Sequence, residues 1–215
     1  MPGSAITLTG FGIGPQAGVG AQAEPDGALP TQLNGVQVLF DGQPAPLLYV
    51  QSQQINAFAP FTLTGATTNL TVAYNGATIG STSVPVVAEI TGLFRLSPLS
   101  TQVADINEDG TVNGPSHPAP VGSVISLYGT GFGQTQLPGV AGTVLPDTAS
   151  SLVTPVKISI GGLSADVLYA GAAPLEFAGI DRINVRIPAG LPPVVTEVSA
   201  TSQITGVQGT TITVQ

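Results

Sequence analysis

The hydrophobic residues of this chain form short alternating runs that are separated by turns rich in glycine and proline. From Val36 the sequence VQVLF has an apolar side chain at every second position, and the pair Asp41-Gly42 follows. Alternation with a period of two is typical of a strand with one buried face, and Asp-Gly favours a tight turn. The pattern predicts a strand, a turn and a return strand within residues 36–60.

The same order of residues occurs a second time, in residues 156–188. Each copy has an alternating strand, a glycine turn, a return strand that ends in Leu-Tyr, and a closing Ile-Asn pair. The residues shared by the two copies are Gly42/Gly162, Ala45/Ala165, Leu48/Leu168, Tyr49/Tyr169, Ile55/Ile183 and Asn56/Asn184. An internal repeat of this length predicts one supersecondary unit used twice. We therefore expect two domains, residues 1–91 and residues 92–215, the second beginning with an acidic and proline-rich connector.

The remaining apolar runs also predict strands. Opening strands are expected in residues 3–14 and 122–133, and Asn75-Gly76 predicts a hairpin between residues 69–73 and 78–84. Residues 84–88 should close the first domain, and residues 194–200 and 210–214 should flank a turn at Gly206. No window has the apolar spacing of a helix. The sequence predicts an all-β protein made of two tandem immunoglobulin-like β-sandwich domains, each of about seven strands.

Composition and charge exclude several partners. Four basic residues against twelve acidic ones give a net charge of −8, which would repel the phosphates of nucleic acids. No apolar run is long enough to span a membrane. Charged residues are only 7% of the chain, so its surface must consist mainly of Thr, Ser, Gln, Asn and Gly. This composition favours a secreted or cell-surface protein.

Several motifs together resemble a known family. They include the strand openings at Gly3-Ser4 and Gly10-Phe11-Gly12, the run from Gly42 to Val50, Gln54-Ile55-Asn56, the linker from Asn107 to Pro115, and Arg182-Ile183-Asn184-Val185. In these motifs the chain resembles the uncharacterised C-terminal domain family of acidobacterial (Solibacter-type) secreted proteins. Each half also resembles the IPT/TIG immunoglobulin-like domains. The resemblance implies an accessory or interaction module of a larger extracellular protein and offers no catalytic residues.

The connector carries the clearest candidate site. Oxygen-bearing side chains occupy positions 1, 3, 5, 7 and 9 of a calcium loop, with Gly110 at position 6, where such loops need a sharp turn. These candidate ligands are Asp105, Asn107, Asp109, Thr111 and Asn113. Position 12, which usually supplies a bidentate Glu, is Ser116. The alternative is a tight turn in which the Asp and Asn side chains cap their own backbone.

Residues that could support catalysis are few. His117 is the only histidine and lies among prolines, so we expect a solvated linker residue rather than part of a catalytic triad or a zinc site. The acidic residues of the repeat regions do not match between the two copies, so we expect them to be surface turn residues. They are Asp41, Asp166, Glu176 and Asp181. No enzymatic activity is expected.

Two repeated residue types remain. Tyr49 and Tyr169 could stack on sugar rings, but we expect them to pack in the core or between domains. Asn56 and Asn184 are expected to hydrogen-bond to loops at the end of each sandwich. We predict a non-enzymatic structural, adhesive or spacer module whose partners are other proteins or extracellular polysaccharide. The alternatives are a carbohydrate-binding module and a self-associating subunit of an extracellular filament.

Overall fold

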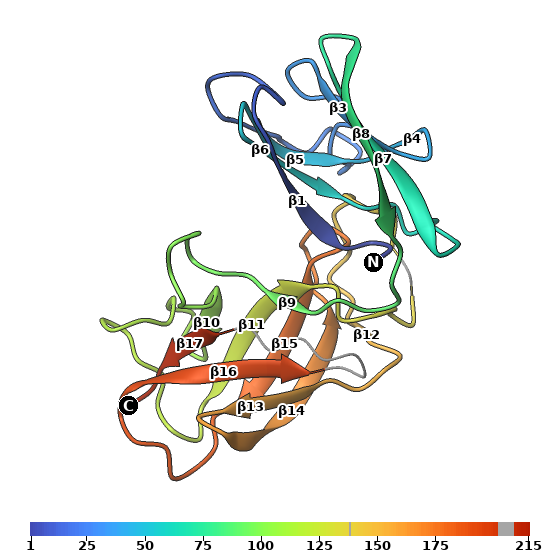
Figure 1. The fold of residues 1–215 in the computed structure, drawn as a ribbon. Coiled ribbons are helices and arrows are strands. Elements are labelled where there is room, and N and C mark those ends of the chain that lie inside the picture. Colours follow the sequence, from blue (N-terminus) through green and yellow to red (C-terminus); the bar gives the residue numbers. More distant parts are fainter. Residues whose placement is uncertain (138, 202–208) are drawn as a thin grey trace. The chain divides into compact units, whose positions relative to one another are not determined.

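The computed structural model describes residues 1–137, 139–201 and 209–215 (Figure 1). All regular secondary structure in these residues is β-strand, which confirms the predicted all-β class. Within the same residues, no helix has the length and apolar character needed to cross a membrane. The turn predicted at Gly206 lies outside the described residues.

The chain divides into two compact units. Unit 1 comprises Met1–Ala88 together with residues 139–148 and Pro174–Gly179, and unit 2 comprises Glu89–Leu137, Ala149–Ala173 and the described residues from Ile180 onward. The crossing at Ala88–Glu89 lies close to the boundary expected after residue 91. Two segments of the second half nevertheless belong to unit 1, so the units are not consecutive stretches of sequence.

The described residues of unit 1 form two four-stranded sheets. The first has the order β1 (Ala5–Thr9), β6 (Gln54–Phe58), β5 (Leu47–Gln51) and β2 (Val19–Gly20). The second has the order β4 (Gln43–Pro44), β3 (Val36–Phe40), β7 (Thr67–Tyr74) and β8 (Ala77–Pro85). Both sheets contribute to one hydrophobic core, to which β3 supplies Val36, Val38 and Phe40 and β6 supplies Ile55. This shared core is consistent with a β-sandwich.

The turns of unit 1 follow the sequence signals. Asn75 and Gly76 connect β7 to β8 and have φ values of 51° and 80°. Asp41 and Gly42 connect β3 to β4 with φ values of 49° and 83°. Two successive positive φ values characterise the type I′ turn, which matches the right-handed twist of paired strands. The predicted hairpin around Asn75-Gly76 is therefore confirmed.

Segments from the second half complete unit 1. Leu29 donates its backbone N–H to the carbonyl of Gly142 over 2.9 Å. The ring of Phe177 lies 6.3 Å from that of Phe58, which is fully buried, and Val144 forms a bridge with Phe177. Unit 1 thus obtains part of its packing from residues that follow it in the sequence by more than fifty positions.

The described residues of unit 2 form nine strands. They are β9 (Gly92–Leu93), β10 (Asp105–Asn107), β11 (Val124–Thr130), β12 (Ser150–Ser151), β13 (Lys157–Ile160), β14 (Leu163–Ala172), β15 (Asp181–Arg186), β16 (Val195–Thr201) and β17 (Thr210–Thr213). Seven of them follow the order β10-β11-β15-β14-β13-β16-β17, while β9 pairs with β11 and β12 pairs with β14. Their alternating apolar residues form a second core, which includes Ile125, Ile158, Ile183 and Val198. Short strands such as β2 and β12 raise the number of strands in both units above the predicted seven.

The strand β14 pairs with two different strands along its length. Its first residues, Leu163–Ala165, pair with β13, and its later residues from Asp166 to Ala172 pair with β15. The matching stretch of unit 1 is divided into β4 and β5, because Pro46 between them has no N–H to donate. The equivalent stretch is therefore one continuous strand, β14, in unit 2 and two separate strands, β4 and β5, in unit 1.

The sequence repeat corresponds to a repeat of strand pairing. The pairs β1–β6, β5–β6, β3–β7 and β7–β8 have the counterparts β11–β15, β14–β15, β13–β16 and β16–β17. A register shift falls between Leu47 and Tyr49 in one unit and between Val167 and Tyr169 in the other. The repeated Leu48 and Leu168 thus mark the same β-bulge, which adds one residue to the return strand.

Candidate functional site

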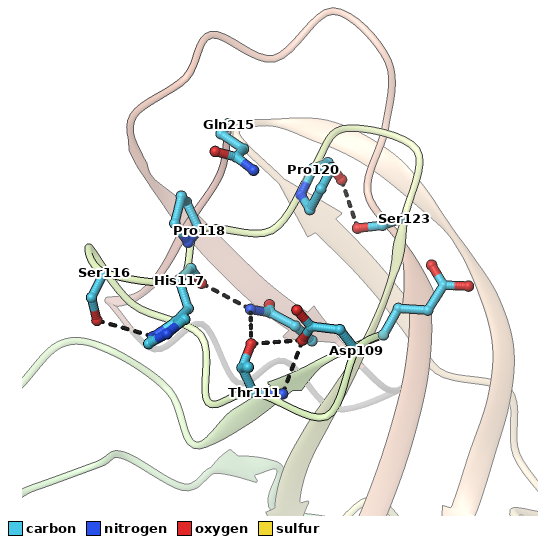
Figure 2. A pocket seen from close by; sticks show the side chains of 10 residues that line it. Asp109, Thr111, Ser116, His117, Pro118, Pro120, Ser123 and Gln215 are labelled. Atoms are coloured by element: carbon cyan, nitrogen blue, oxygen red, sulfur yellow. Dashed lines mark hydrogen bonds between the residues drawn. The ribbon is translucent and has the colours of Figure 1, made fainter.

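The candidate calcium ligands lie in β10, in the tight turn that follows it and just after this turn; Figure 2 labels two of them, Asp109 and Thr111. Gly110 donates its N–H to the carbonyl of Asn107 over 2.9 Å, and Asn107 donates to the carbonyl of Thr111 over 2.8 Å. Gly110 has a φ of 84°, a value that favours glycine. The sequence Asn-Glu-Asp-Gly therefore forms the tight turn of the alternative interpretation.

Asp109 and Thr111 bind each other on the exposed side of this turn. The Oδ1 atom of Asp109 accepts hydrogen bonds from the hydroxyl of Thr111 over 2.6 Å and from its backbone N–H over 2.9 Å. Both bonds lower the pKa of the Asp109 carboxyl, and the bond from the hydroxyl has the larger effect. The carboxylate is thus stabilised by its own turn.

Asn107 and Asn113 lie inside the unit, where their side-chain amides are hydrogen-bonded to neighbours. Asn107 donates from Nδ2 to the hydroxyl of Thr111 and to the carbonyl of His117, and its Oδ1 accepts from Nδ2 of Asn113 over 3.0 Å. Asn113 also exchanges bonds with the backbone of Thr213, donating to the carbonyl over 2.9 Å and accepting from the N–H over 2.8 Å. Both asparagines therefore fasten the connector to β17 and to the turn.

Asp105 is the most deeply buried of the five candidates, with 1% of its surface exposed. Its Oδ1 atom accepts a hydrogen bond from Nε2 of Gln102 over 3.2 Å, whereas its Oδ2 atom is buried without a partner. Burial raises the pKa of this carboxyl to about 7, against the smaller opposing effect of the Gln102 bond. Near neutral pH the group is divided between its protonated and ionised forms.

The structure brings these five residues together only in part. Asn107, Asp109 and Thr111 line one pocket, and Asn113 reaches it through Asn107, but Asp105 does not line it. Most of their oxygens already accept hydrogen bonds from the protein, and calcium requires six to eight oxygen ligands. Among the described residues, no group of three or more His, Cys, Asp and Glu side chains is arranged to hold a metal ion. Calcium binding stays a prediction.

The pocket beside the turn has a volume of about 520 Å³. Figure 2 shows the residues that line it, which come from the turn, the proline-rich stretch after it and the C-terminus; they are Asn107, Glu108, Asp109, Thr111, Ser116, His117, Pro118, Pro120, Ser123 and Gln215. His117 is exposed, and its Nδ1 atom lies 3.1 Å from the hydroxyl of the adjacent Ser116. The Oε2 atom of Glu108 accepts the N–H of Val124 over 3.2 Å. The polar groups of the pocket thus serve mainly to hold its own loop.

A second buried carboxyl lies elsewhere in unit 2, and the expectation that it is a surface turn residue is wrong. Asp181 is the first residue of β15, is 7% exposed, and accepts the N–H of Phe132 over 3.4 Å. Burial raises the pKa of Asp181 to about 7, which outweighs that hydrogen bond. The sequence contains one sign of this burial. Asp181 directly precedes the alternating strand RINV, and its position matches the face of the strand that Ile183 and Val185 occupy. The other three acidic residues, Asp41, Asp166 and Glu176, are exposed as expected.

The repeated tyrosines follow the bulge of each return strand and are half-buried. The Tyr49 hydroxyl donates to Oε1 of Gln51 over 2.9 Å, and the Tyr169 hydroxyl donates to the carbonyl of Ala172 over 2.6 Å. The guanidinium carbon of Arg182 lies 5.4 Å from the centre of the Tyr169 ring. These contacts tie each ring to its own strand or to the strand beside it.

The repeated asparagines were expected to bind loops, and the structure corrects this expectation. Asn56 accepts at Oδ1 from the Thr7 hydroxyl over 3.2 Å, and Asn184 accepts at Oδ1 from the Ser126 hydroxyl over 3.0 Å. Thr7 and Ser126 are the residues directly opposite on β1 and β11. Each asparagine therefore joins two strands of a sheet, because its side chain points across the ladder rather than towards the sandwich end.

A comparison with protein-family models found no match for this chain, and a search of the curated proteins found none.

Proposed function

We propose that this chain is a non-enzymatic structural module, an adhesive or spacer element of a larger extracellular protein, built from two immunoglobulin-like β-sandwich domains. The main support for this proposal is that the side chains of the candidate site are already hydrogen-bonded within the protein. Asn107 and Asn113 bond to the turn and to the backbone of β17, and Asp109 caps its own turn. Side chains engaged in this way hold a connector in place and are not free to act on a substrate.

The repeat supports the same proposal. The features that recur in both units are the bulge at Leu48 and Leu168 and the cross-strand bond of Asn56 and Asn184. The polar residues that could support chemistry do not recur. Asp105, His117 and Asp181 lie in unit 2, and the repeat does not carry equivalents of them in unit 1. A module selected for its shape retains bracing residues, whereas a duplicated binding site would retain its ligands.

Secretion or display at the cell surface fits the composition. The chain has no cysteine, charged residues make up only 7% of it, and its net charge is −8. An acidic protein with few lysines and arginines has little attraction for nucleic acids or anionic membranes. The resemblance to acidobacterial secreted proteins agrees with this location.

Single-molecule pulling on the two chain termini tests the structural role. A load-bearing module should lengthen in abrupt cooperative steps, because its strands are joined by many long-range hydrogen bonds that break together. Gradual extension at low force, without discrete steps, would contradict the proposal. Chains with Asn56→Ala and Asn184→Ala should lengthen at lower force, and chains with Gln53→Ala, which changes an exposed residue, should behave like the wild type.

A further inference from the structure

The strand β8 forms an open edge of unit 1. It is the last strand of the order β4-β3-β7-β8, and among the described residues its strand pairing is with β7 alone. Eight of its nine residues are exposed, and Val84 alone is half-buried against the core of unit 1. Such an edge presents a row of backbone N–H and C=O groups to any strand that can align with it.

The corresponding edge in unit 2 is covered. β17 pairs with β16 as β8 pairs with β7, and the connector lies along its other side. Val103 and Ala119 donate their N–H groups to the carbonyls of Thr211 and Thr213, and Thr211 donates to Thr101. The outer edge of β17 therefore accepts further backbone hydrogen bonds from the connector, and among the described residues no segment covers the corresponding edge of β8 in this way.

The outward-pointing backbone groups of β8 follow from its pairing. Val86 donates its N–H to the carbonyl of Ala66 over 2.9 Å, and antiparallel ladders alternate between bonded and non-bonded pairs. With Thr68 opposite Val84 and Leu70 opposite Thr82, these pairs bond across the hairpin. The N–H and C=O groups of Ser81 and Ser83 consequently point to the open edge.

The edge also lacks the charges that usually prevent strands from joining. Residues 67–85 contain no charged side chain, although the chain has a net charge of −8. Lysine and other charged residues at edge strands normally oppose such pairing. Two copies can therefore approach along β8 without bringing charged side chains of this hairpin together. Cross-strand pairs of Thr and Ser, which a joined edge would contain, stabilise sheets.

We propose that β8 pairs antiparallel with β8 of a second copy of this chain, across a twofold axis at Thr82. In this register Ser81 of one copy lies opposite Ser83 of the other, and each donates its N–H to the carbonyl of its partner. Thr82 then faces Thr82 of the second copy, and the two four-stranded sheets join into one. The pairing is closed, because the same edge is used by both copies. The proposed dimer follows from the open edge of β8 and does not depend on the proposed structural role.

Sedimentation velocity over a concentration series tests the pairing. A single strand pair buries less area than a permanent interface, so we expect a weak dimer that forms at concentrations up to about 1 mM. The mass should rise from 21.4 kDa towards twice that value and no further. A mass that stays at one copy throughout the series, or that grows beyond two copies, overturns the proposal.

Two variants at one position identify the edge. Ser83→Pro removes an outward N–H while leaving the bonds to β7, and proline is accepted at such edge positions. We expect this variant to remain a monomer, and we expect Ser83→Ala, which keeps the N–H, to dimerise like the wild type. Equal dimerisation of the wild type and Ser83→Pro overturns the proposal.

Amide hydrogen exchange on the wild type tests the same pairing without a substitution. Its result therefore does not depend on whether the proline variant folds. The Ser81 and Ser83 amides should exchange at least tenfold more slowly at high than at low protein concentration. Exchange at the same rate in both samples overturns the self-pairing. Protection that appears only when an extended peptide is added would assign the edge to a different partner and overturn it as well.

Discussion

The hydroxyl of Ser126 donates a hydrogen bond to Oδ1 of Asn184, its opposite residue on the neighbouring strand, over 3.0 Å. Thr7 and Asn56 have the same relationship in unit 1, over 3.2 Å. Because both pairs occupy equivalent registers, we call each of them a brace. The braces join the opening strand of each unit to the strand that closes the repeated motif.

Removal of a brace should destabilise its unit. Asn184→Ala deletes the acceptor of a half-buried bond, and we expect a loss of about 1 kcal/mol in the free energy of unfolding. Asn56→Ala should cost less, because Thr7 is exposed and water can replace the lost bond. Urea unfolding of both variants, followed by circular dichroism, measures the two losses.

A double-mutant cycle with Ser126→Ala separates the brace from other effects of Asn184→Ala. If the bond is the cause, the two losses should overlap, so that the double variant is no less stable than the single asparagine variant. Fully additive losses would show that the two side chains act independently and would contradict the brace.

Unit 1 should be incomplete when the second half is missing. A fragment of residues 1–91 lacks the segments that supply Gly142 and Phe177, which contact Leu29 and Phe58. We expect this fragment to unfold at a lower temperature than unit 1 in the whole chain, and to bind a hydrophobic dye because the ring of Phe58 is uncovered. In the whole chain, Phe177→Ala should reproduce part of the loss, on the order of 1 kcal/mol. A fragment as stable as the intact unit would contradict the division of the chain described above.

The stability of unit 2 should fall as the pH rises from 5 to 8. Asp105 and Asp181 both have a pKa of about 7 in the folded chain, raised by burial from the ordinary value of 3.8. Folding therefore favours the protonated form, so each group contributes stability at low pH that is lost as the pH rises through 7. The expected loss between pH 5 and pH 8 is on the order of 2 kcal/mol for each group.

Amide variants of these two carboxyls provide the control. Asp105→Asn can still accept the bond from Gln102, and Asp181→Asn can still accept the N–H of Phe132, but neither can ionise. We expect the pH dependence measured by urea unfolding to become smaller in each variant and to disappear nearly completely in the double variant. Stability that rises with pH in the wild type would contradict the burial of these acids.

Calcium should bind weakly at the connector turn, at concentrations on the order of 1 mM. The oxygens of Asn107, Asp109 and Asn113 already accept hydrogen bonds, and calcium must displace them. Titration calorimetry of the wild type and Asp109→Ala measures this. No binding heat in the wild type would end the calcium interpretation, and an equal heat in Asp109→Ala would place calcium at another site.

The alternating runs and turn residues were sufficient to predict the strands, because these signals are local. The hairpin at Asn75-Gly76 and the strand from Val36 to Phe40 form where the pattern indicated. The repeat likewise predicted the equivalent pairing of the two units. Its Leu-Tyr pair did not reveal the bulge, since a register shift depends on the strand opposite as well as on the residues themselves.

Features that depend on distant contacts could not be predicted in this way. Asp181 resembles a turn residue in the sequence, but it is buried at the start of β15, where it accepts the N–H of Phe132. The asparagines at 56 and 184 could have bonded to loops or across the sheet, and only the register decides between these arrangements. The candidate calcium ligands alternate in sequence, but the strand β10 directs Asp105 into the core, away from Asp109 in the exposed turn.

We propose that the features shared by the two units serve stability and not the recognition of a ligand. A glycan-array screen of the wild type, with calcium present and absent, is the sharpest test, because a carbohydrate-binding module is the main alternative and Tyr49 and Tyr169 are the repeated aromatic residues. We predict no saturable binding to any glycan in either condition. Saturable binding to one glycan that is lost in Tyr49→Ala or Tyr169→Ala would show that the repeated features recognise a ligand.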